Sequence, residues 1–156
     1  MATTRIHRDI AAPRATVYAA LVHGDAVRTW MVPTGMTSRV HEFDATEGGR
    51  FRISLTYDDP AQSGKTAGAT DTFHGHFAEL ILDEKVVQTV EFDTHDPAIT
   101  GEMRITYTLS DGPAGTRVDA VHEGLPDGVS AADNELGWSI SLGKLAALAE
   151  GREIPR

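Results

Sequence analysis

The stretch AADNELGWSISLGKLAALAE, residues 131–150, decides the fold. Its apolar residues recur at helical spacing, and Ser130, three residues before Asp133, can cap the first turn. The stretch therefore predicts one long helix from about Ala131 to Glu150. One stripe of this helix carries Trp138, Ser141, Leu142, Leu145, Leu148 and Ala149. Such a stripe needs an apolar surface to pack against.

The middle of the chain supplies that surface as predicted strands. Apolar and polar residues alternate there with a period of two, which is typical of an antiparallel sheet with one buried face. No helix is available for crossover connections, so consecutive strands must form a meander. The predicted strands include residues 49–57, 72–82, 86–92, 102–109 and 117–122.

The N-terminal residues complete the order of elements. Thr3–Ile10 alternates as a strand, and Pro13 suits the first turn of a following helix. Gly24 is expected to end this helix in a left-handed conformation, and Asp25 to cap a second short helix that Pro33 stops. The predicted order is β-α-α-β6-α. It indicates an α+β helix-grip fold over a single domain, residues 1–156, in which a curved antiparallel sheet wraps round the C-terminal helix.

Composition excludes several classes of function. The formal net charge of −9 comes without a cluster of Lys and Arg, which argues against nucleic-acid binding. The absence of cysteine excludes disulfides, thiolate metal sites and cysteine nucleophiles. No apolar run is long enough to span a membrane, and the first ten residues lack the apolar core of a signal peptide. We therefore expect a cytoplasmic protein.

Several short motifs occur in an order that resembles a known family. Ile10-Ala-Ala-Pro13, Val17-Tyr18-Ala-Ala-Leu21 and Trp30 are similar to the opening of the START-like (SRPBCC) superfamily. Its branch named after the activator of heat-shock-protein-ninety ATPase also has counterparts of the motifs that follow here. These are Gly48-Gly49-x-Phe51, Gly75-x-Phe77-x-Glu79-Leu80, Thr89-x-x-Phe92 and Asn134-x-x-Gly137-Trp138-x-x-x-Leu142-x-x-Leu145.

This resemblance implies the helix-grip fold but leaves the function open, because the fold hosts lipid carriers, ligand binders, cyclases and co-chaperone domains. The co-chaperone of that name has two domains, and this chain has no room for the second. The leading hypothesis is therefore binding of a small hydrophobic molecule, a lipid, aromatic or polyketide-like compound, without a cofactor. A protein-interaction module of co-chaperone type and, last, a cyclase or hydratase are the alternatives.

The space between the sheet and the last helix is where a ligand would sit. Aromatic, Met and Leu side chains predicted to point inward are the candidate lining, and His122 or Tyr107 would orient a polar end of the ligand. The candidate ligand-binding residues are Trp30, Met36, Phe51, Phe77, Phe92, Met103, Tyr107, His122, Trp138 and Leu142. A second apolar patch at Leu136 and Ile140 favours a covering partner, so a homodimer is an alternative to a monomer.

Four polar residues suggest other chemistry. His74 and His76 share one face of a strand, but their neighbours Phe73 and Phe77 occupy the other face, so we expect both histidines to point outward and predict no metal site. His122 has inward parity and is expected to be hydrogen-bonded in the core. Glu79 also has inward parity, and we expect a bulge to turn it outward.

Overall fold

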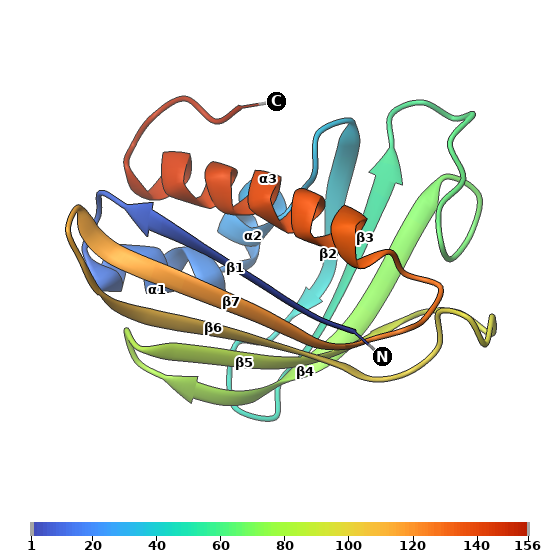
Figure 1. Cartoon of the computed structure of the whole chain (residues 1–156), viewed down its shortest axis with the longest axis horizontal. Helices are drawn as coiled ribbons and strands as arrows, with labels where there is room; N and C mark the ends of the chain where they lie inside the picture. Colours follow the sequence, from blue (N-terminus) through green and yellow to red (C-terminus); the bar gives the residue numbers. More distant parts are fainter. Residues whose placement is uncertain (1, 156) are drawn as a thin grey trace.

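The computed structural model describes residues 2–155 and has the predicted order of elements (Figure 1). Seven antiparallel strands form one open sheet in the order β1-β7-β6-β5-β4-β3-β2, and α3 lies across one face of it with α1 and α2. The α+β helix-grip prediction is confirmed. The elements are β1 (Ala2–Ile10), α1 (Arg14–Val22), α2 (Gly24–Trp30), β2 (Met36–Phe43), β3 (Arg50–Tyr57), β4 (Thr70–Ile81), β5 (Lys85–Phe92), β6 (Met103–Gly112), β7 (Gly115–Leu125) and α3 (Ala131–Ala149).

The long C-terminal helix forms as its sequence predicts. The Ser130 hydroxyl accepts a hydrogen bond from the Asp133 backbone N–H at 3.2 Å, which satisfies one of the free donors of the first turn. Leu142 and Leu145 of the predicted stripe are buried against the core, whereas Trp138, nearer the N-terminus of the helix, is half-buried. The C-terminal half of α3 therefore anchors the helix, and its N-terminal half is closer to solvent.

The junction between the first two helices differs from the prediction. Gly24 is not a left-handed cap of α1; it is the first residue of α2, and the extended His23 (φ −116°) separates the two helices. A Cβ at position 24 would lie 3.4 Å from Cβ of Phe43, so the glycine lets α2 approach β2 closely. A tertiary contact explains this glycine, and Asp25 lies inside the first turn rather than at the cap.

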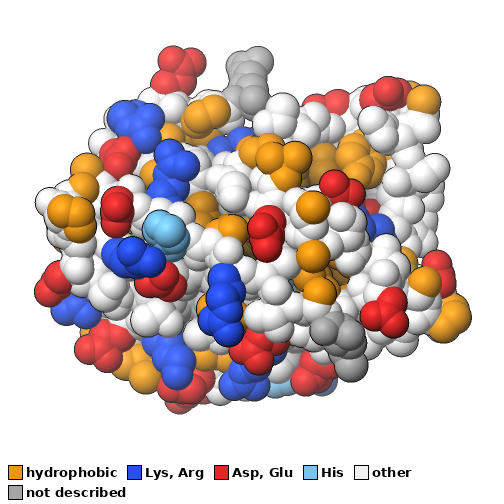
Figure 2. Space-filling view, viewed as in Figure 1, with side chains coloured by type: hydrophobic (Ala, Val, Ile, Leu, Met, Phe, Trp, Pro, Cys, Tyr) orange, Lys and Arg blue, Asp and Glu red, His pale blue; other side chains and the backbone are white. Residues whose placement is uncertain are grey.

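The core lies between the sheet and the three helices and is rich in aromatic rings. The ring centroids of Trp30 and Tyr107 are 6.2 Å apart, and those of Phe51 and Phe77 are 5.5 Å apart. These separations fall in the favourable range for edge-to-face contacts. On the surface, side chains of both charge signs are interspersed over the face that carries α3 (Figure 2). Within residues 2–155, no helix is long and apolar enough to cross a membrane.

Candidate functional site

Most of the ten candidate ligand-binding residues are packed in the core. His122 is buried, and Met36, Phe92 and Trp138 are half-buried. The remaining six are almost wholly buried, and Phe51 among them also borders the hollow on the outer face of the sheet described below. These six, each at most 2% exposed, are Trp30, Phe51, Phe77, Met103, Tyr107 and Leu142. The space expected between sheet and helix is therefore closed at these positions.

Two of the candidates form a polar pair on the inner face of the sheet. His122 of β7 is paired with Ile105 of β6, and Tyr107 lies two residues further along β6, so both side chains point toward α3. Trp138 of α3 covers them, with its ring centroid 6.1 Å from that of Tyr107 and 6.0 Å from that of His122. We call Tyr107, His122, Asn134 and Trp138 the inner cluster.

The Tyr107 hydroxyl is the least satisfied group of the inner cluster. Tyr107 is 1% exposed, and its hydroxyl oxygen has no hydrogen-bond partner within residues 2–155. Burial raises the pKa of this hydroxyl well above its ordinary value of 10.0, so it stays protonated. A buried hydroxyl without a partner costs about 1–3 kcal/mol. This unfavourable free energy arises at the centre of the predicted ligand-binding site.

His122 is held by two polar neighbours, as expected for a core histidine. Its Nε2 lies 3.3 Å from Sδ of Met103, and its Nδ1 lies 3.2 Å from Nδ2 of Asn134. Asn134 in turn accepts a hydrogen bond from the Thr4 hydroxyl at 2.7 Å. Burial lowers the pKa of His122 to about 4, so the imidazole is neutral at physiological pH.

Two of these partners were not predicted. Thr4 and Asn134 do not appear among the candidate residues, although simple signals point to both. Thr4 shares the face of Ile6 and Ile10 on the first strand, and Asn134 lies four residues before Trp138, on the same side of the helix. A polar side chain on each apolar face indicates a hydrogen-bond partner inside.

Glu79 lies outside the inner cluster. The register between β4 and β5 shifts between Phe77 and Glu79, which confirms the predicted bulge. The Glu79 carboxylate lies 3.4 Å from Nζ of Lys85, and both side chains are partly exposed. This pairing accounts for the carboxylate, and Glu79 has no place in an internal acid–base pair.

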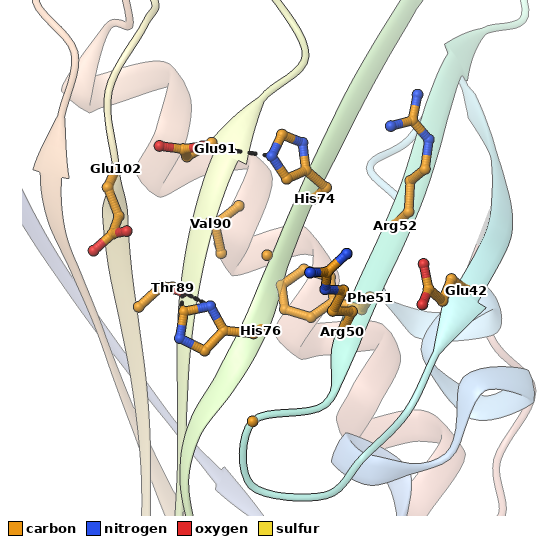
Figure 3. A pocket seen from close by; sticks show the side chains of 12 residues that line it. Glu42, Arg50, Phe51, Arg52, His74, His76, Thr89, Val90, Glu91 and Glu102 are labelled. Carbon is orange, nitrogen blue, oxygen red and sulfur yellow. Dashed lines mark hydrogen bonds and ion pairs between the residues drawn. The ribbon is translucent and has the colours of Figure 1, made fainter.

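A separate hollow of about 650 Å³ lies on the outer face of the sheet, opposite α3 (Figure 3). His74 and His76 point into it, which confirms that they face away from the core. His74 contacts the Asp93 carboxylate, which also pairs with Arg52, and His76 lies 2.8 Å from the Thr89 hydroxyl. Among residues 2–155, no three side chains of His, Asp or Glu are grouped so that they could hold a metal ion.

Solved structures resemble this chain over nearly its whole length. Protein CV1439 from Chromobacterium violaceum is 34% identical, with a TM-score of 0.85 over 95% of this chain and 96% of that one. The AHSA1 (SPO3351) protein from Silicibacter pomeroyi is 22% identical, with a TM-score of 0.76 over 94% of this chain and 96% of the other, and shows the shared fold.

No curated protein matches the chain. The family described as Activator of Hsp90 ATPase homolog 1-like protein matches residues 11–150. That span runs from the end of β1 to the end of α3 and includes the whole inner cluster. The chain therefore belongs to this family of START-like proteins.

Proposed function

We propose that the protein binds a small, largely apolar molecule carrying one polar atom, between the sheet and the N-terminal half of α3. The observation that supports this proposal is the Tyr107 hydroxyl, which is buried beside Trp138 without a partner. A polar atom of a ligand would supply the missing hydrogen bond. START-like folds commonly bind hydrophobic ligands, which is consistent with this placement.

Trp138 is the side chain that must move for a ligand to enter. It is half-buried and covers both Tyr107 and His122, whereas Leu142, one turn later on α3, is fully packed. Outward rotation of Trp138 would vacate the space over the polar pair without disturbing the anchored half of the helix. Each 100 Å² of apolar ligand surface buried there would contribute about 2.5 kcal/mol.

The ionisation of the inner cluster favours binding over catalysis. General acid–base groups work best when their pKa lies near the operating pH. Burial moves the pKa of His122 down to about 4 and that of Tyr107 well above its ordinary value, so neither exchanges protons readily at neutral pH. A cyclase or hydratase would need an acid–base pair whose pKa values lie closer to neutral pH.

A protein-interaction role is the second candidate because α3 also exposes an apolar side chain. Leu136 is 63% exposed on the solvent side of the helix, near the region proposed as the ligand entrance. An exposed leucine on the solvent side of the helix is suited to contact with a partner protein. This role places the functional surface outside the sheet–helix space.

Titration with Nile red, a neutral apolar dye, tests the proposed site. Wild-type protein is expected to bind the dye saturably with a rise in fluorescence, and the variant Trp138→Arg to bind at least about tenfold more weakly because it places a charge at the entrance. Leu136→Arg adds the same charge on the exposed side of the same helix and is expected to bind like the wild type. The proposal fails if the wild type does not bind or if Leu136→Arg weakens binding as much as Trp138→Arg.

A further inference from the structure

The protonation of His122 follows from its neighbours. Met103 presents a thioether sulfur, which carries no proton and can only accept, so Nε2 of His122 must carry the hydrogen that points to it at 3.3 Å. In a neutral imidazole, Nδ1 is then the acceptor, and it receives the Asn134 Nδ2–H at 3.2 Å. This leaves the amide oxygen of Asn134 to accept from Thr4, at the observed 2.7 Å. The whole chain of contacts is consistent with one tautomer.

The inner face therefore presents two donors that differ in how well they are satisfied. His122 offers its Nε2–H, whose acceptor among residues 2–155 is a thioether sulfur, a weak one. Tyr107 offers a hydroxyl proton that has no acceptor in the part of the chain that the structure describes. Both rings contact the same side chain, Trp138, at centroid distances of 6.0 and 6.1 Å. The Nε2–H of His122 is directed at Met103, on the other side of Ile105 from Tyr107, so a ligand oxygen placed where Trp138 now packs would accept from the Tyr107 hydroxyl.

The surroundings of these donors are uncharged. The ring and hydrogen-bond contacts of Tyr107 and His122 within residues 2–155 are with Trp30, Met103, Asn134 and Trp138. No Lys or Arg is among them, and His122 itself is neutral. A carboxylate buried there would lack a counter-ion, which carries a large desolvation cost.

We infer that the ligand's buried polar end is an uncharged hydrogen-bond acceptor, such as a ketone, aldehyde or ester carbonyl, held by the Tyr107 hydroxyl beside the neutral His122. The inference rests on the proposed binding site and narrows its ligand class. It predicts that carbonyl compounds bind more tightly than free fatty acids and plain hydrocarbons.

Three probes of matched shape test this selection: 2-acetylnaphthalene, 2-naphthoate and 2-ethylnaphthalene, titrated at pH 7.5 and followed by NMR shifts of the protein. The ketone is expected to bind about tenfold more tightly than the ethyl compound, because it pairs a hydroxyl that is otherwise unsatisfied, and also more tightly than the carboxylate. If none of the three binds, the proposed function itself is wrong. If the probes bind but the ethyl compound equals the ketone, or the carboxylate binds best, the binding site stands and this inference is overturned.

A substitution tests whether the Tyr107 hydroxyl causes the preference for the ketone. Tyr107→Phe keeps the ring between Trp30 and Trp138 but removes the hydroxyl, and it is expected to reduce the ketone's advantage from about tenfold to threefold or less. Tyr18→Phe removes the hydroxyl of a buried tyrosine in α1 and is expected to keep the full advantage. An unchanged advantage in Tyr107→Phe overturns the inference.

The carbonyl stretch of the bound ketone provides a readout that needs no variant. Infrared difference spectra of the wild-type complex should place this band below its frequency in cyclohexane, where the carbonyl has no donor. A hydrogen bond from the protein weakens the C=O bond and lowers the frequency. A band at the cyclohexane frequency means that no donor reaches the oxygen, and the inference is then wrong.

Discussion

His122 predicts a strong loss of stability in mild acid. Its pKa is about 4 in the folded protein, whereas an unfolded histidine titrates near 6.5. Below pH 6.5 the unfolded chain takes up a proton that the folded chain refuses, so stability falls as the pH drops from 6.5 to 4 and is unaffected by this group above 6.5. The gap of about 2.5 pKa units corresponds to about 3 kcal/mol in full, of which about 2 kcal/mol is lost by pH 5.

Urea unfolding followed by circular dichroism between pH 7.5 and 5 measures this loss. The comparison needs a variant because the chain has seven histidines and many carboxylates. His122→Gln removes the buried titration and is expected to lose about 2 kcal/mol less than the wild type over this range. His7→Gln, at an exposed position of β1, should follow the wild type. Equal pH dependence in the wild type and His122→Gln would refute the assignment of a depressed pKa.

Three substitutions test the packing. Gly137→Ala should stabilise the protein by up to about 1 kcal/mol and raise the midpoint of thermal unfolding, because a helical Cβ there meets nothing closer than Cγ of Pro33 at 4.0 Å; a lower midpoint contradicts this. Gly75→Ala should destabilise by about 3 kcal/mol in urea titrations, since its Cβ would lie 1.7 Å from the Thr89 carbonyl oxygen, and near wild-type stability would show the strand to be more open than described. Tyr107→Phe should leave the unliganded protein as stable as the wild type or up to about 1 kcal/mol more stable, whereas a clear loss would mean that the hydroxyl has a partner after all.

The fold could be predicted from local patterns because each pattern has a physical cause. The alternation in residues 50–57 gives a strand with one buried face, and the stripe around Leu142 and Leu145 gives a helix that must cover it. Gly24 shows where such reasoning stops. A glycine after a helix usually indicates a left-handed cap, but here it makes room for Phe43, a residue nearly twenty positions away.

The sequence was enough to predict which residues of the candidate site face inward, but not which hydrogen bonds they make. Strand parity places Tyr107 and His122 inward, and helical spacing places Trp138 opposite them. The free hydroxyl of Tyr107 could not be foreseen, because it depends on where every other polar group finds its partner. The outer hollow was also missed. It depends on how four strands, β2 to β5, curve together, and alternation says which face a residue occupies but not how that face bends.

Intermolecular NOEs between unlabelled 2-acetylnaphthalene and the ¹³C,¹⁵N-labelled protein test the binding site most directly. Our account predicts NOEs from the ligand to ring protons of Tyr107, His122 and Trp138. NOEs confined to His74 and His76 would place the ligand in the outer hollow and contradict the account, and so would the absence of any NOE from a saturated sample to the inner face of the sheet.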